Sequence, residues 1–281
     1  MRNIEVGRVR LAVGIDVGGT KIAAGVVDIA SGRVLERAQQ PTRPERGGGA
    51  VLADCAALAA QLGAGKLPVG VGLCELVGLD GRPASADTID WRDLDPAESF
   101  NAPRVVLESD VRAAAFAEAR FGAGAVRSPF LFVIVGTGAS VCFVPDGRPY
   151  AGAHGQAIVL GAPPVEAVAS GRALALAAGL ERAEDVIADP AFSGLVDAAA
   201  RDLGRVLAVL ANALDPAVIV LGGGLGGEPE FRNRVEASCR PLLAYPSTPE
   251  LEIVGSLADD GGIVGAAMYA LESSDGPRTR A

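Results

Sequence analysis

The feature that most constrains the fold is the segment Val13–Lys21, where an apolar run ends in a carboxylate, two glycines, a hydroxyl and a lysine. A second apolar run, Ile22–Val27, follows directly. Apolar runs of this length bounded by glycine favour strands, so the segment predicts strand, tight turn and strand. Gly18 and Gly19 would let backbone amides approach an anion closely. An ordinary hairpin with a Gly-Gly turn is the alternative interpretation.

Composition narrows the class of protein. With 281 residues, of which 49% are hydrophobic, the chain can bury the core of one large or two moderate domains. The net charge of −9 argues against binding nucleic acid or an anionic membrane. No apolar run reaches the roughly 18 residues that span a membrane, and no signal peptide is recognisable. We therefore expect a soluble cytoplasmic protein, whose scattered cysteines, without any CxxC pair, are free thiols.

Apolar patterning along the chain indicates alternating strands and helices. Strands are expected to about residue 37 and at 67–73, 105–107, 130–135, 139–144 and 218–221. Helices are expected at 50–62, 111–121, 165–178, 193–214 and 268–271, with a Pro/Gly-rich loop at 41–49 and a polar tail at 273–281. Gly136-Thr137-Gly138 repeats the strand–turn–strand plan of the first motif. Two such halves predict duplicated α/β lobes with a cleft between them.

Four motifs in order carry a family resemblance. Asp16–Lys21 resembles the first phosphate motif of the ROK family (repressors, open reading frames and sugar kinases), within the actin/hexokinase-like ATPase superfamily. Gly136–Gly138 is similar to its second phosphate motif, and Asp215–Leu225 to its adenosine-side motif. Asp259–Ala267 resembles its C-terminal signature. The resemblance covers nearly the whole chain, from Gly14 to about Leu271.

The resemblance implies an α/β fold of two RNase H-like (actin-like ATPase) lobes, with mixed sheets flanked by helices and a central cleft. It implies an N-terminal small lobe of residues 1–110 plus a C-terminal helix around 265–281, and a large lobe of residues 111–264. It also implies ATP and Mg²⁺ as cofactors and a homodimer. Only Met1–Ala12 precede the first motif, too few residues for the DNA-binding domain of the family's repressors.

Roles on the nucleotide side follow from the resemblance. Asp110 occupies the position of the catalytic Asp, which accepts the proton of the attacking hydroxyl; a helix N-cap is the alternative. Asp16 would order Mg²⁺ through water. Lys21 would supply positive charge at the phosphoryl group or be an exposed strand lysine. The residues expected to bind the nucleotide are Asp16, Gly18, Gly19, Thr20, Lys21, Gly136, Thr137, Gly138, Gly222, Gly223 and Gly224.

On the acceptor side the chain departs from the family pattern. Gly155–Val159 replaces the stretch that supplies a sugar-binding Glu and a zinc-binding His, and the cysteine cluster that should follow is missing, so we expect no zinc. Cys74-Glu75 stands in place of Pro-Gly, and Ser109 in place of Asn. The candidate acceptor ligands are Glu75, Thr88, Ser109, Asp110, His154 and Gln156.

Several of these residues keep a second interpretation. Glu75 could point to solvent, and His154 could be a loop histidine bonded to backbone or water. Glu118, two turns after Asp110, is as compatible with a solvated surface charge as with a role in function. An intact donor side and a rewritten acceptor side predict a kinase for a hexose, an amino sugar or a sugar-like cyclitol. The alternative is a non-catalytic sensor of sugar or nucleotide, or a pseudokinase, on the same fold.

Overall fold

The protein is described by a computed structural model that covers residues 10–158, 169–244, 251–257 and 260–272. The chain divides into two compact units, the first comprising Met1–Ala117 and Asp260–Ala281 and the second Glu118–Asp259. In the part of the chain described by the structure, no helix is both long and apolar enough to cross a membrane.

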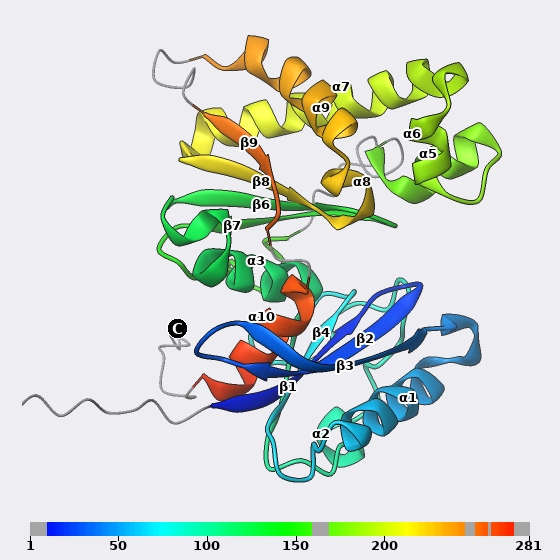
Figure 1. Ribbon diagram of the computed structural model, residues 1–281, viewed down its shortest axis with the longest axis vertical. Coiled ribbons are helices and arrows are strands. Elements are labelled where there is room, and N and C mark those ends of the chain that lie inside the picture. Colours follow the sequence, from blue (N-terminus) through cyan, green and yellow to red (C-terminus); the bar gives the residue numbers. More distant parts are fainter. Residues whose placement is uncertain (1–9, 159–168, 245–250, 258–259, 273–281) are drawn as a thin grey trace, which may run out of the picture. The chain divides into compact units, whose positions relative to one another are not determined.

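The first unit is built on a mixed five-stranded sheet in the order β3-β2-β1-β4-β5 (Figure 1). Its antiparallel half contains β1 (Leu11–Val17), β2 (Lys21–Asp28) and β3 (Arg33–Pro41), joined by short turns. The strands β4 (Val69–Leu73) and β5 (Val105–Ser109) extend the sheet parallel to β1. The carboxyl ends of β1, β4 and β5 therefore lie along the same edge of the sheet.

The two faces of this sheet differ in the size of their side chains. Val13, Ile15 and Val17 of β1 belong to a core cluster that includes side chains of α1 (Gly48–Gln61). The alternate residues face α10 (Gly261–Leu271), where a Cβ at Gly14 would overlap the carbonyl oxygen of Ile263. A Cβ at Gly70 of β4 would likewise overlap a carbonyl oxygen of α10. The alternation of valine and glycine thus lets the α10 backbone pack directly on the sheet. The remaining helices of the unit are η1 (Pro44–Arg46), α2 (Pro96–Ser99) and α3 (Asp110–Phe121), the last of which continues into the second unit.

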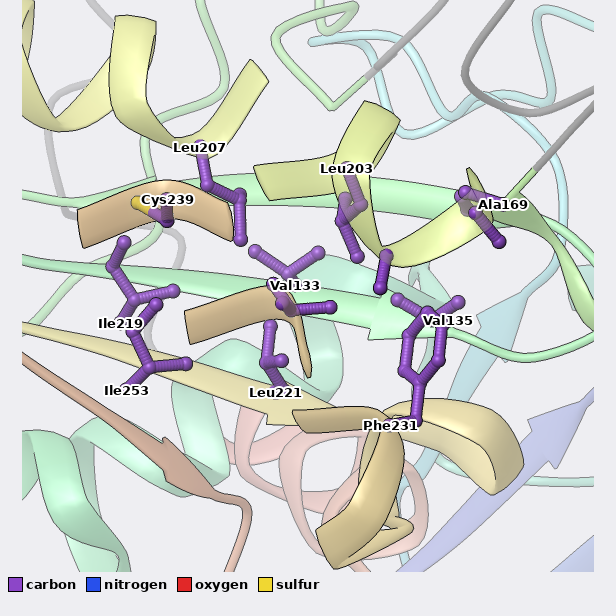
Figure 2. Packing of buried hydrophobic residues seen from close by; sticks show 14 of the residues in the cluster. Val133, Val135, Ala169, Leu203, Leu207, Ile219, Leu221, Phe231, Cys239 and Ile253 are labelled. Atoms are coloured by element: carbon purple, nitrogen blue, oxygen red, sulfur yellow. The ribbon is translucent and has the colours of Figure 1, made fainter. Parts of the chain in front are cut away.

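The second unit contains a four-stranded sheet in the order β7-β6-β8-β9. The strands β6 (Phe130–Val135) and β7 (Ala139–Val144) pair antiparallel, while β8 (Val218–Gly222) and β9 (Glu252–Gly255) are added parallel to β6. The long helices α7 (Ser193–Leu214) and α9 (Pro229–Cys239) contribute to the core on this sheet, where Leu203 and Leu207 lie near Val133 (Figure 2). Shorter helices complete the unit: η2 (Ala123–Ala125), α5 (Gly171–Ala178), α6 (Ala183–Ala188), η3 (Pro190–Phe192), α8 (Gly223–Gly227) and η4 (Arg240–Leu242).

The α/β class with mixed sheets flanked by helices is confirmed, and the expected elements at 130–135, 139–144 and 193–214 have the bounds of β6, β7 and α7. Several other elements differ from expectation by one or two residues at an edge, and two differ by more. The strand expected to end near residue 37 continues as β3 to Pro41, because pairing with β2 overrides its polar composition. The closing helix contains Met268–Leu271 as expected, but it begins at Gly261 and not around residue 265, because packing on β1 and β4 stabilises its glycine-rich start. Within 165–178 the structure describes α5, while 159–168 and the tail at 273–281 lie outside the described residues.

Candidate active site

The turn between β1 and β2 is braced by a residue that sequence reasoning missed. Thr42 is fully buried, its hydroxyl donates to the carbonyl oxygen of Gly18 at 2.6 Å, and its amide donates to that of Thr20 at 3.0 Å. The Gly18 amide donates to the carbonyl oxygen of Lys21 at 3.0 Å. Neither Gly18 nor Gly19 has a positive φ, so the turn of this antiparallel hairpin is not of type I′. No signal in the sequence marks Thr42, which simply follows β3.

Asp16 lies near the carboxyl end of β1, half-buried and opposite Gly72 of β4. Its carboxylate lies against Gly262, in the first turn of α10, where a Cβ would come within 2.6 Å of the Asp16 Cγ. Burial raises the pKa of Asp16 to about 6; the charge of Asp260 raises it further, and the nearby positive charge of Lys21 lowers it. The Asp16 carboxylate is suited to a hydrated cation, and the lysine and the glycine turn at residues 18–21 (hereafter the phosphate-type turn) are suited to an anion such as a phosphate.

Asp110 begins α3, directly after β5. Its carboxylate accepts a hydrogen bond from the amide of Val111 at 2.6 Å, one residue away, whereas an N-cap side chain bonds the second or third amide of its helix. Burial raises the pKa of Asp110 to about 7, and the negative charge of Asp16 raises it further. Gly72 lies beside both residues. It pairs with Asp16 in the sheet, and a Cβ added to Gly72 would lie 3.5 Å from the Asp110 Cα. The two carboxylates thus lie at the same sheet edge, close enough for the charge of Asp16 to act on Asp110.

Glu75 follows β4 and is 4% exposed, so the interpretation as a solvent-facing charge is wrong. Its carboxylate accepts four hydrogen bonds, one from the Ser85 hydroxyl and three from the backbone amides of Asp87, Thr88 and Ile89. Thr88 itself is exposed, and its methyl group lies 3.4 Å from the place that a Cβ added to Gly19 would take. The structure therefore brings the 85–89 segment to the phosphate-type turn through Glu75.

Ser109 is fully buried, one residue before Asp110. Its hydroxyl donates to the carbonyl oxygen of Glu75 at 2.9 Å and accepts from the amide of Val77 at 3.1 Å. Arg112, which sequence reasoning missed, is 2% exposed and donates to Glu108 at 2.7 Å and to the Val77 carbonyl oxygen at 2.6 Å. The spacing of Glu108 and Arg112 by four residues was the available signal. Both side chains hold the chain that follows β4 against the start of α3.

In the second unit, the Gly136-Thr137-Gly138 turn joins β6 to β7. The Gly136 amide donates to the carbonyl oxygen of Gly138 at 2.9 Å, and the Gly136 carbonyl oxygen accepts from the amide of Gly171 at 2.6 Å. Thr137 is exposed at the tip. The Thr137 side chain is therefore open to a ligand, while the backbone of Gly136 is fixed by Gly138 and by the start of α5.

Gly222, Gly223 and Gly224 form the junction of β8 and α8. Gly223 has φ 82°, and its Cβ would come within 2.6 Å of the Val135 carbonyl oxygen at the end of β6. Only glycine fits this position, for conformation and for space. Because β6 and β8 are parallel neighbours, their two glycine turns lie at the same edge of the second sheet.

The remaining predicted acceptor residues, His154 and Gln156, belong to the second unit. Both are exposed in the loop after β7, on either side of Gly155, which has φ 75°. Val159 of the same stretch lies outside the described residues. Among the side chains that the structure describes, no three His, Cys, Asp or Glu residues are grouped as a metal site would require.

Glu118 is not a surface charge. Its side chain is fully buried and accepts hydrogen bonds from the Ala123 amide at 2.8 Å and from the Ser256 hydroxyl at 2.9 Å. A surface interpretation was reasonable from the sequence because these partners are not adjacent to Glu118 in the chain.

Comparison with known proteins identifies similar chains. The model of the ROK family matches residues 12–166 and 164–273. A glucokinase of Streptomyces coelicolor is 30% identical over 93% of this chain and 98% of its own length. An N-acetylmannosamine kinase of Escherichia coli is 28% identical over 91% of this chain and 97% of its own. Among solved structures, a ROK family glucokinase from Streptomyces griseus in complex with glucose and AMPPNP superposes with a TM-score of 0.80 at 29% identity, covering 92% of this chain and 98% of that one.

Proposed function

The chain belongs to the ROK family, and on that premise we propose that it is an ATP- and Mg²⁺-dependent kinase acting on a hydroxyl of a hexose, an amino sugar or a sugar-like cyclitol. The observation that carries the proposal is the pair of carboxylates, Asp16 and Asp110, at one sheet edge beside the 18–21 turn. A sugar-binding sensor needs recognition, but it does not need a basic carboxylate at this place.

Asp110 is proposed as the general base. Its carboxylate takes the proton of the acceptor hydroxyl while the hydroxyl oxygen forms a bond to the γ-phosphorus of ATP; the bond to the β,γ-bridging oxygen breaks and ADP leaves. A pKa of about 7 suits this role, because a base is most effective when its pKa lies near the working pH. The bond from the Val111 amide holds the carboxylate in place.

Asp16 is the residue that would hold Mg²⁺, through the cation's water ligands. The donor chemistry fits, since Mg²⁺ prefers carboxylate and water oxygens, and the lack of a side chain at Gly262 lets the Asp16 carboxylate lie directly against the first turn of α10. When bound with ATP, the cation neutralises charge on the phosphates. Lys21 adds positive charge on the same side, and Gly18, Gly19 and Thr20 present the turn backbone and a hydroxyl.

For the second unit we infer nucleotide contacts by the two glycine turns. Thr137 offers an exposed side chain with a hydroxyl, Gly136 and Gly138 keep the turn on either side of it free of side chains, and Gly222–Gly224 leave the end of β8 free of side chains. The support is the resemblance of both turns to the family's nucleotide-side motifs, the match to the ROK family and the AMPPNP complex of the similar Streptomyces griseus kinase.

The acceptor class is supported by the names of the relatives, a glucokinase and an N-acetylmannosamine kinase. The cyclitol option rests on the replacement of the family's sugar-binding Glu by Gln156 and of its zinc-binding His by Val159. Thr88, His154 and Gln156 are exposed and remain the proposed acceptor contacts. We also propose a cytoplasmic homodimer that does not require zinc.

The test is a coupled ADP-release assay with Mg²⁺ and ATP against a panel of hexoses, amino sugars and cyclitols, with Asp110→Asn as the control. Turnover on one acceptor, reduced about 10²–10⁴-fold in the variant, is expected and would also identify the acceptor class. Nucleotide or sugar binding without turnover on any acceptor, unaffected by the variant, would instead favour the sensor or pseudokinase.

A further inference from the structure

We propose that Glu75 is a positioning residue for acceptor recognition: it fixes the 85–89 segment and thereby places the Thr88 side chain for contact with the acceptor. The inference rests on the proposed function and names a residue that acts through another. It replaces the expectation that Glu75 contacts the acceptor directly.

The geometry of the carboxylate carries the first step. One oxygen accepts from the amides of Thr88 and Ile89, at 2.6 and 2.7 Å. The other accepts from the Ser85 hydroxyl at 2.5 Å and from the Asp87 amide at 2.9 Å. A buried carboxylate is stable only when such donors satisfy it, and bonds to an ionised acceptor are about twice as strong as neutral ones. With four donors engaged and the residue 4% exposed, the carboxylate is not free to bind a sugar hydroxyl.

The second step is that the chain is anchored again just after the 85–89 segment, while the segment itself is open at Thr88. Trp91 is fully buried, and its indole N–H donates to the carbonyl oxygen of Gly48 at 2.9 Å. Between these anchors Thr88 is exposed, beside the Cβ position of Gly19. Of the 85–89 segment, it is therefore Thr88 that presents a hydroxyl-bearing side chain at the phosphate-type turn.

The third step connects Glu75 to the proposed base. Its backbone carbonyl oxygen accepts the hydroxyl of Ser109, the residue before Asp110. Both the backbone and the side chain of Glu75 are thus fixed, the first to the start of α3 and the second to the segment that carries Thr88. Loss of the carboxylate would move Thr88 relative to Asp110 and leave Asp110 in place.

The first measurement is the set of steady-state constants of Glu75→Gln. In glutamine one oxygen becomes an NH₂ group, which cannot accept from a backbone amide, so at least one of the four hydrogen bonds is lost and the others no longer go to an ionised acceptor. We expect the KM for the acceptor to rise about tenfold or more, with kcat and the KM for ATP within about threefold. Ser85→Ala, which removes one donor, should give a smaller rise of the same kind.

Glu118→Gln is the matched control. Glu118 is also a buried carboxylate bonded to a backbone amide and a serine hydroxyl, but it lies in the second unit. The control should show a comparable loss of thermal stability without a selective rise in the acceptor KM. An equal rise of both KM values in Glu75→Gln, or the same selective rise in Glu118→Gln, would overturn the proposal.

A double-mutant cycle with Thr88→Val tests whether Glu75 acts through Thr88. If it does, Glu75→Gln raises the acceptor KM much less in the Thr88→Val background than in the wild type. Independent, additive effects would contradict the positioning role.

Amide hydrogen exchange separates this inference from the proposed function, because it needs no turnover. Exchange at residues 87–89 that is faster by about tenfold or more in Glu75→Gln supports the proposal that Glu75 holds this segment in place. Unchanged exchange there refutes the proposal even if the protein is an active kinase. A wild type that neither turns over nor binds any acceptor in calorimetry would refute the proposed function, and with it the acceptor role of Thr88.

Discussion

Gly262 lies directly against the carboxylate of Asp16, so close that a Cβ on Gly262 would come within 2.6 Å of the carboxyl carbon. The pair joins the first turn of α10, near the end of the chain, to the last polar residue of β1. The helix that packs on the sheet of the first unit is thus also one wall of the proposed Mg²⁺ site. Any side chain at position 262 must displace the carboxylate that is expected to order the cation.

Gly262→Ala should therefore impair catalysis although alanine favours helix. We expect about a tenfold or greater loss of kcat/KM, with a raised Mg²⁺ requirement, because misplacing a positioned group by a fraction of an ångström is costly. The measurement is kinase activity as a function of Mg²⁺ concentration. Gly194→Ala, in the first turn of α7 with nothing within 4 Å of its Cβ position, is the control and should leave activity unchanged. Wild-type kinetics in Gly262→Ala would contradict the close contact.

Asp110→Asn should stabilise the fold while it removes activity. The folded protein raises the pKa of this carboxyl from 3.8 to about 7, so between these values the folded state binds more protons than the unfolded state. Wild-type stability therefore falls as the pH rises through this interval, and the full cost remains above it. Removing the charge should add roughly 1–3 kcal/mol to the free energy of unfolding near pH 8. Denaturant unfolding at several pH values measures this, and the gain should vanish near pH 4; a variant less stable than wild type at pH 8 would contradict it.

The pH profile of kcat/KM should report the same carboxyls in the free enzyme. A base must be deprotonated to act, so kcat/KM should fall about tenfold per pH unit below the Asp110 pKa of about 7. Below the Asp16 pKa of about 6 the fall should steepen, because a protonated Asp16 no longer attracts a cation. A plateau is expected above pH 7. Rates that stay constant from about pH 8 down to about pH 5 would argue against both assignments.

Gly223→Ala should weaken the second unit and its nucleotide contacts. The substitution combines φ 82° with an approach of 2.6 Å to a backbone oxygen that cannot yield, and we expect a loss of more than about 2 kcal/mol in unfolding free energy. Gly179→Ala has φ 70° but open space, so it measures the conformational part alone and should cost about 1 kcal/mol. Thermal unfolding of both variants measures the loss of stability, and repeating it with an ATP analogue shows whether Gly223→Ala also weakens nucleotide binding. Equal losses of stability in Gly223→Ala and Gly179→Ala would show that the close approach to Val135 is unimportant.

The sequence predicted most accurately those elements that depend on the pattern of neighbouring residues in the chain. The apolar runs of β6 and β7 and the long periodic run of α7 have their predicted bounds because strand alternation and helical period are properties of neighbouring residues. The position of Asp110 at the start of α3 was correctly predicted for the same reason. The motifs also gave the correct family, since they lie in fixed order along the chain.

What the sequence by itself determined is therefore the α/β class, the family and the order of the glycine turns and carboxylates. Only the tertiary structure decided what the individual side chains bond to. Glu75 and Ser109 were expected to reach for the acceptor, but the first bonds amides 12 to 14 residues later and the second bonds backbone more than 30 residues earlier. Thr42 and Gly262 gain their importance from partners on other elements. The physical reason is that burial leaves each polar group to whichever donor or acceptor the fold brings within about 3 Å, and sequence spacing does not encode that distance.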